Sequence, residues 1–269
     1  MSPGYVTLGY SDIALAAALV LVNGVISFAL QLGLERRLFW AALRMTVQLL
    51  LIGFVLKWVF ADGRLWVVGG VLAAMTVIAG LSAVRRAERT FPGMVFASIV
   101  SIWVSAWIIT AFALGLIVRS DPWYAPQHSV PLTGLILGNS LTGISLALDR
   151  FTAELVGKRA EVETLLSLGA TRWEAARDAI RQSLRAGLIP MLNAMLVAGI
   201  VSLPGMMTGQ LLSGADPAQA ARYQIMVMFL LAASTALGTI GVVLLSYRRL
   251  FNDHHQFRHD LVSARRRDR

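Results

Sequence analysis

The segment RFTAELVGKRAEVETLLSLGATRWEAARDAIRQSLR, residues 150–185, separates two apolar runs, and the second run is interrupted by SLPGMMTGQ, residues 202–210. A charged connection of about 35 residues is far longer than the few residues that usually join two helices. We therefore interpret it as a docking element for a partner in water. Proline and glycine inside an apolar helix release backbone hydrogen bonds that lipid cannot replace. The interruption therefore indicates part of a pathway that faces protein or water.

The chain as a whole is strongly apolar. Of its 269 residues, 57% are hydrophobic and 14% are charged, and the mean hydropathy is +0.66. This composition excludes an ordinary soluble domain. The net charge of +9 does not indicate a nucleic-acid partner, because the basic residues lie at the ends of apolar runs. No cysteine is present, so disulfides and thiolate metal sites are excluded.

Apolar runs long enough to cross a bilayer, which takes about 20 residues, recur along the chain. They cover residues 13–32, 38–60, 65–84, 94–118, 130–148, 186–212 and 224–246. We therefore expect an all-α polytopic membrane protein with about seven transmembrane helices. Most of the 24 lysines and arginines lie on the side that holds the charged segment, which predicts an outside N-terminus and a cytoplasmic C-terminus.

One transmembrane domain is expected over residues 1–246, with a cytoplasmic loop at 149–185. The basic tail, 247–269, is expected in the cytoplasm as a helix extension with a disordered end beside anionic lipid. Two of its histidines, His255 and His259, are four residues apart. They indicate either a metal-binding pair on a helix or a solvated helix face.

The charged segment contains signals for two helices. The first covers residues 158–168 and ends at Gly169, the residue type that best tolerates a left-handed cap. Thr171, with Glu174 three residues later, has the capping-box pattern and starts a short second helix. We expect that helix to lie across the inner mouth of the spans with Trp173 available to a partner. A surface helix without a partner is the alternative.

The stretch Glu163-Thr164-Leu165-Leu166-Ser167-Leu168-Gly169-Ala170-Thr171 resembles the cytoplasmic loop of ABC-transporter permeases. In those proteins, Glu and Gly at this spacing precede a coupling helix that sits in a cleft of the ATPase subunit. The chain departs from the importer pattern at Thr164 and Leu165. Its fuller match is to the bacterial iron-export ABC permease family (FetB-like), which has plant relatives tied to aluminium tolerance. The match is carried by Gln48 with residues 53–57, Gly138-Asn139, residues 166–171 and 185–190, Val201-Ser202-Leu203-Pro204-Gly205-Met206-Met207, and Tyr223-Gln224-Ile225-Met226-Val227.

The resemblance implies a permease subunit that exports iron or another metal, driven by ATP hydrolysis in a separate cytoplasmic ABC ATPase. It implies a homodimer of this chain with two ATPase subunits in the bacterial inner membrane. The chain itself is expected to be neither an enzyme nor a cofactor protein, since its only Gly-Lys pair, Gly157-Lys158, precedes Arg159 and forms no P-loop. ATP and Mg²⁺ would bind the partner. The expected ATPase-coupling residues are Glu163, Gly169, Ala170, Thr171, Arg172, Trp173 and Glu174.

The interruption is the predicted substrate pathway. Pro204 would free a carbonyl near Ile200. Oxygen donors there suit hard cations, whereas Met206 and Met207 offer soft thioethers, unless these methionines only pack at the bend. The metal ligands stay unknown. The predicted pathway residues are Asn139, Ser202, Pro204, Gly205, Met206, Met207, Gln210, Tyr223 and Gln224.

Other functions remain open. An ABC permease for a nucleotide sugar, an organic acid or a lipid is compatible with the apolar spans. A stand-alone secondary transporter or channel explains the interruption but gives the docking element no role. An intramembrane enzyme would need a catalytic pair in the spans, and neither His-Glu-x-x-His nor Gly-x-Ser-x-Gly occurs.

Overall fold

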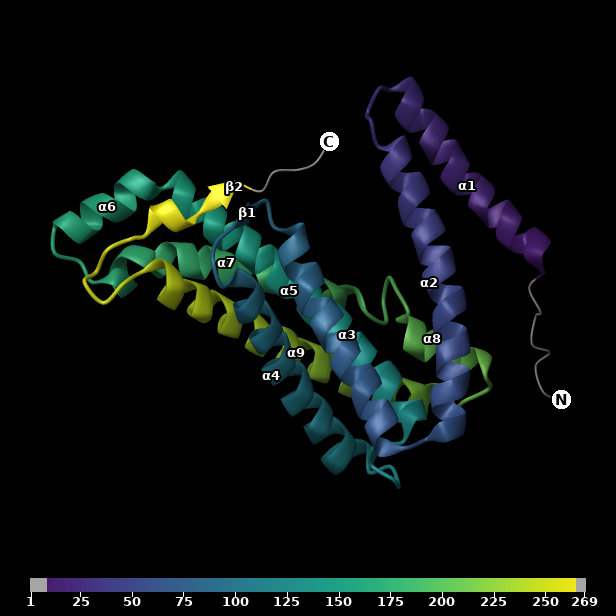
Figure 1. Cartoon of the computed structure of the whole chain (residues 1–269). Helices are drawn as coiled ribbons and strands as arrows, with labels where there is room; N and C mark the ends of the chain where they lie inside the picture. Colours follow the sequence, from purple (N-terminus) through teal and green to yellow (C-terminus); the bar gives the residue numbers. More distant parts are fainter. Residues whose placement is uncertain (1–8, 265–269) are drawn as a thin grey trace. The chain divides into compact units, whose positions relative to one another are not determined.

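The structure, a computed structural model, describes residues 9–264, and most of these residues are helical (Figure 1). The helices confirm the all-α fold. Six of them are long and apolar enough to cross a membrane. The chain divides into two compact units, of which the first ends at Arg64 and the second begins at Leu65. A single transmembrane domain over residues 1–246 stays a prediction.

The first unit is a pair of helices, α1 (Tyr10–Ala29) and α2 (Glu35–Asp62). Ser27 holds their connection, because its Oγ donates to Glu35 Oε2 at 3.1 Å and accepts the Leu34 N–H at 3.1 Å. α2 ends at Gly63, whose φ of 58° lies in the left-handed region that glycine adopts without strain. Large apolar side chains are exposed along both helices, as expected for helices that cross a bilayer.

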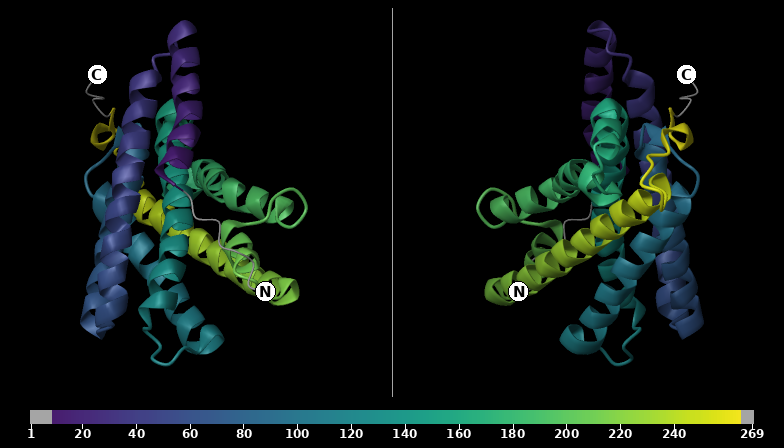
Figure 2. Two further views of the ribbon diagram at one scale, coloured as in Figure 1. Left: turned by 90° about the vertical axis from the view of Figure 1, so that its right-hand side faces the viewer. Right: turned by 90° about the vertical axis from the view of Figure 1, so that its left-hand side faces the viewer.

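The second unit is built around α5 (Pro126–Gly157), which packs against α3, α4, α7 and α9. These four helices are α3 (Leu65–Arg86), α4 (Met94–Phe112), α7 (Arg172–Val197) and α9 (Pro217–Leu250). A π-helical turn, η1 (Ala113–Val118), extends α4, so the predicted span 94–118 is continuous. Figure 2 shows α9 running obliquely across α5.

Two glycines allow a close helix crossing in this unit. A Cβ added to Gly187 of α7 would lie 2.7 Å from the carbonyl oxygen of Gly143 in α5. It would also lie 2.7 Å from Cγ2 of Thr239 in α9. Both distances are shorter than any ordinary carbon contact. Because neither glycine has a side chain, α5, α7 and α9 meet there at backbone distance, as small residues allow in membrane helices.

The predicted sixth span, 186–212, is not one bent helix. α7 begins in the charged segment, continues past Ala186 and ends at Val197. A separate helix, α8 (Gly205–Leu212), follows a loop over residues 198–204. The other six predicted spans coincide with α1, α2, α3, α4 with η1, α5 and α9, although α5 and α9 extend well beyond the predicted ends.

The loop between α7 and α8 explains the difference. Gly199 has a φ of 81°, and its N–H donates to the Ser202 carbonyl at 2.9 Å. Pro204 is the N-cap of α8, so it starts a helix and does not lie inside one. The carbonyl of Ile200, which we expected Pro204 to free from a helix, therefore belongs to the loop. A left-handed glycine ends one helix, and a residue without an N–H suits the start of the next.

The tail folds beyond α9, contrary to the expected helix extension. α9 ends at Leu250, because Asn252 Oδ1 accepts the N–H groups of His254 and Gln256 at 3.1 and 2.8 Å and forms a turn. A 3₁₀ turn, η2 (His259–Leu261), follows. The short strand β2 (Ser263–Ala264) then pairs antiparallel with β1 (Arg89–Thr90). The expected disordered end, residues 265–269, lies outside the described residues.

Candidate docking and transport site

The turn between α6 and α7 has the geometry that its sequence predicts. α6 (Arg159–Ser167) ends in a Schellman motif, in which the Gly169 N–H donates to the Leu166 carbonyl at 3.1 Å. The Ala170 N–H donates to the Leu165 carbonyl at 3.0 Å, and Gly169 has a φ of 91°. Leu168 is left 79% exposed at the surface of the turn. The turn is therefore a fixed, exposed feature and not a loose loop.

α7 begins with the predicted capping box. Thr171 Oγ1 accepts the Glu174 N–H at 3.3 Å, and Glu174 Oε2 accepts the Thr171 N–H at 2.8 Å and its hydroxyl at 2.7 Å. These bonds from the backbone N–H and then from the hydroxyl of Thr171 lower the pKa of Glu174 from its usual value of 4.5. Glu174 is therefore ionised at neutral pH, which also suits the positive end of the helix.

Arg172 connects the turn to the tail. Its backbone N–H donates to His255 Nδ1 at 2.9 Å, and its Nη1 lies 2.7 Å from Asp253 Oδ1. Arg172 is thus engaged within the chain, although we predicted it for a partner. His255 has a φ of 54° and lies in a turn, and His259 lies in η2, so the helical pair of histidines is wrong. No group of three or more His, Asp or Glu residues suited to a metal occurs within residues 9–264.

A row of aromatic rings joins the start of α7 to the end of α9 and the tail. The Trp173 ring lies edge-on to Tyr247 with centroids 5.6 Å apart. Tyr247 and Phe251 are 5.4 Å apart, and Phe251 stacks on Phe257 at 5.3 Å. Trp173 remains 47% exposed, so one part of its ring packs internally and another is open to a partner. This row was not predicted, because Trp173 is far from the other three rings in the sequence.

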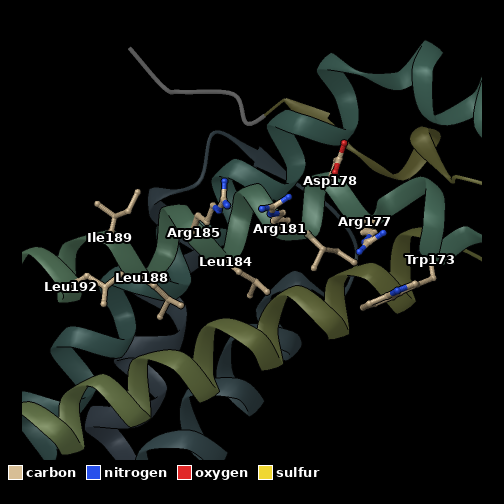
Figure 3. Close-up of a pocket in the computed structure, with 10 residues that line it drawn as sticks. Trp173, Arg177, Asp178, Arg181, Leu184, Arg185, Leu188, Ile189 and Leu192 are labelled. Carbon is tan, nitrogen blue, oxygen red and sulfur yellow. The ribbon is translucent and has the colours of Figure 1, made fainter.

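An open groove of about 870 Å³ follows α7 from Trp173 toward Leu192. Figure 3 shows Arg177, Arg181 and Arg185 following one another along α7, with leucines directed toward α9. Within residues 9–264, these three guanidinium groups have no ion-pair partner. The groove therefore presents a basic edge next to the turn between α6 and α7.

A second cavity, of about 380 Å³, lies at the other end of α7. Residues from the end of α7, the following loop, α8 and the first half of α9 surround it. They are Met195, Ala198, Gly199, Pro204, Met207, Ala221, Gln224, Ile225, Met228 and Phe229. At this cavity, the interruption of the predicted sixth span lies next to α9. No charged side chain lines the cavity.

Gln224 gives this cavity its one buried amide. The side chain is 7% exposed, and its Oε1 has no hydrogen-bond partner in the described part of the chain. An unpaired buried acceptor of this kind is costly in a folded protein and is often completed by a ligand or water.

The comparisons with known proteins place the chain in a family. The profile of a family described as "Uncharacterised protein family (UPF0014)" matches residues 10–251, which is nearly the whole chain. The chain belongs to the UPF0014 family. It is a polytopic membrane protein, consistent with the six long apolar helices in the described part of the chain.

Several UPF0014 relatives align over most of their length. "UPF0014 membrane protein slr1647" of Synechocystis is 41% identical over 84% of this chain and 87% of its own. "Probable iron export permease protein FetB" of Escherichia coli is 34% identical over 91% of this chain and 93% of its own. "Protein ALUMINUM SENSITIVE 3" of Arabidopsis thaliana is 29% identical over 93% and 90%. No solved structure matches the chain.

The structure brings only some of the predicted pathway residues together in this UPF0014 chain. Pro204, Met207 and Gln224 line the cavity. Met206 and Tyr223 pack against the apolar core instead. The remaining four predicted residues, Asn139, Ser202, Gly205 and Gln210, do not line the cavity. Asn139 Nδ2 instead donates to the Leu135 carbonyl of its own helix at 3.0 Å. Ser202 and Gly205 are exposed, and Gln210 is half-buried.

Several cavity residues escaped the sequence analysis. On α9, Ala221, Gln224, Ile225 and Met228 follow the spacing of one helix face. That spacing, once Gln224 was singled out, could have identified Met228. Met195 gave no such signal, because its place depends on where α7 ends.

Proposed function

We propose that this chain is the membrane-spanning permease subunit of an ABC-type exporter. Two copies of the chain would work with two separate ATPase subunits in the bacterial inner membrane, and the cargo would be iron or another metal. The name of the relative "Probable iron export permease protein FetB" supports the cargo. The exposed, capped turn that begins α7 supports the ATPase partner, because a docking element must be both accessible and fixed.

The observation that carries the proposal is the continuity of α7. This helix of 26 residues begins at the turn between α6 and α7, residues 168–171, which we call the docking turn, and it ends at the cavity without a break. At 1.5 Å per residue it is about 39 Å long, which is more than the thickness of the apolar layer of a bilayer. A helix that joins the docking turn to the cavity offers a direct route from ATP-driven movement to the transport pathway.

The working cycle follows from this connection. The ATPase would hold the turn around Gly169 and Thr171 and displace it when its subunits close on ATP. α7 would carry that displacement past its crossing with α5 to the loop at residues 198–204. The cavity beside Gln224 would then change shape and exposure, because its wall is formed by that loop on one side and by α9 on the other.

The test is coupled ATP hydrolysis and export. The chain is co-expressed with a candidate ATPase, purified as a complex and reconstituted in lipid, and iron-stimulated ATP hydrolysis and iron efflux are measured. Glu174→Ala removes one half of the capping box and should leave the complex assembled but strongly reduce stimulation. Glu161→Ala, an exposed acid of α6 outside the turn, is the matched control and should behave as the wild type.

Two results would contradict the proposal. One is the absence of any stable complex with an ATPase. The other is that the Glu174→Ala and Glu161→Ala complexes both assemble and show equal iron-stimulated ATP hydrolysis and equal iron efflux.

A further inference from the structure

Three methionines from three separate elements converge on the cavity beside Gln224. Met195 lies near the end of α7, Met207 is in α8 and Met228 is in α9, and all three line the same space. Met195 and Met228 also contact the apolar core, whereas Met206 contacts the core and does not line the cavity. The two adjacent methionines of the sequence therefore have different environments, and only one of them faces the cavity.

The donors in this cavity define the chemistry that it can hold. Thioether sulfur is a soft donor that prefers soft, reduced metal ions, whereas hard cations prefer carboxylates and several oxygens. No carboxylate lines the cavity, and no group of three or more His, Asp or Glu residues suited to a metal exists within residues 9–264. A highly charged ion would enter an apolar space without a counter-charge, which is strongly unfavourable. A singly charged soft ion has the smallest desolvation cost.

Gln224 supplies the second observation. Its Oε1 is buried, lacks a hydrogen-bond donor among the described residues and belongs to a side chain that lines the cavity, so rotation of this side chain would bring the oxygen to the open space. A carbonyl oxygen in this state is completed by a cation or by a donor. Methionine has three flexible side-chain torsions, so the thioethers can move toward an ion even though the open cavity, about 380 Å³, exceeds the volume of one ion.

We propose that this cavity is a binding site for a soft, reduced metal cation, held by the thioethers of Met195, Met207 and Met228 with Gln224 Oε1 as a further donor. The proposal deepens the proposed function, because it names a soft cation, one of the metals other than iron that this function allows, as the cargo of the same site. It rests on that function only for the idea that the bound ion is transported. Binding itself needs no ATPase.

The test uses Ag⁺, a redox-inert soft cation, on the purified full chain in lipid nanodiscs. Isothermal titration measures the affinity, and elemental analysis after desalting measures the bound silver per chain. Met207→Leu and Met228→Leu should each weaken the tightest Ag⁺ site by about ten-fold or more, as is typical when a metal site loses a supporting group. Gln224→Leu should weaken it as well.

Met206→Leu is the matched control, since it removes a thioether one residue away that packs outside the cavity. It should leave the tightest Ag⁺ site unchanged. Gallium(III), a redox-inert hard trivalent cation, should not compete with Ag⁺ at equal concentration. Circular dichroism and elution as a single species establish that each variant is folded.

The proposal is overturned if Met207→Leu and Met206→Leu bind silver equally, or if gallium displaces it. These outcomes differ from failure of the proposed function. If the chain binds Ag⁺ through Met207 but assembles with no ATPase, the metal site is supported and the ABC assignment is rejected. If the chain couples to an ATPase but binds no silver at the cavity, the permease function is supported and this metal site is rejected.

Discussion

Gly187 leaves no room for a side chain where α5, α7 and α9 meet. The nearest atoms to an added Cβ include a backbone carbonyl, that of Gly143, which cannot rotate away as a flexible side chain would. The sequence contains 23 glycines and does not reveal which of them lie at a crossing, because each crossing is made by residues distant in the chain.

Gly187→Ala should destabilise the protein by about 1–3 kcal/mol, because the new methyl group must push two helices apart. Gly138→Ala is the control, since a Cβ there meets no atom within 4 Å and alanine favours the helix. Thermal unfolding of both variants in the same detergent tests this. Equal melting temperatures for the two variants would show that the crossing is looser than the structure indicates.

The lowered pKa of Glu174 predicts how its contribution to stability depends on pH. A carboxyl group with a lowered pKa in the folded state stabilises the fold above its unfolded value of 4.5, and this contribution is lost as pH falls through the lowered pKa. The melting temperature of wild type should exceed that of Glu174→Gln at neutral pH, and the difference should shrink below pH 4.5. A difference that grows on acidification would contradict the assignment. The effect should be small, since Glu174 is exposed.

For single residues, sequence patterns that act within a few positions were reliable, and properties that depend on contacts between distant segments could not be predicted. The helix-capping roles of Gly169, Thr171 and Glu174 were predicted correctly, because each acts on backbone within a few residues of itself. The buried Oε1 of Gln224, which has no hydrogen-bond partner among the described residues, could not be predicted. Its surroundings depend on which atoms α7 and α8 bring near α9. The soft thioether of Met207 could be distinguished from that of Met206 only once the direction of α8 was known.

Among the elements, α7 departs most from its prediction. Hydropathy changes sign near Ala186, and we placed a helix boundary at that change. A helix, however, ends where its backbone hydrogen bonds end, and nothing between Thr171 and Val197 stops them, since the helix continues through Pro190. The capping signal at one end and Gly199 at the other were the true limits. Polarity along the helix marks its environment and not its length.

The tail is the second element that the sequence did not reveal. His255→Ala should loosen it, because the Arg172 N–H loses its acceptor, a change worth about 0.5–1.5 kcal/mol for an ordinary hydrogen bond. Hydrogen exchange of the amides from 252 to 258 should accelerate in this variant. His254→Ala is the control, since the His254 side chain makes no hydrogen bond within the described residues. Equal acceleration in both variants would show that the contact does not hold the tail.

For the whole molecule, hydropathy and charge predicted the class of protein and most of its spans correctly. They could not predict the division at Arg64 or the folded tail, because both depend on contacts and not on composition. The orientation in the membrane stays a prediction.

The absence of cysteine makes that orientation directly testable, since every single-cysteine variant carries one thiol. Leu168→Cys in the docking turn should react with an impermeant maleimide only from the cytoplasmic side. Ser120→Cys, between α4 and α5, and Ile200→Cys, between α7 and α8, should react only from the outside, as the positive-inside rule predicts. Labelling of Leu168→Cys and Ser120→Cys from one side would overturn the topology.

The backbone contact at Gly187 divides α7 unequally. From Arg172 to Gly187 the helix is about 22 Å long, and from Gly187 to Val197 about 15 Å, at 1.5 Å per residue. If α7 pivots there as a rigid body, the crossing is the fulcrum of a lever whose longer arm reaches the docking turn. The mechanical advantage then favours force over distance: a displacement at the turn arrives at the cavity reduced to about two-thirds and in the opposite direction. An inward pull at one end would drive the cavity wall outward.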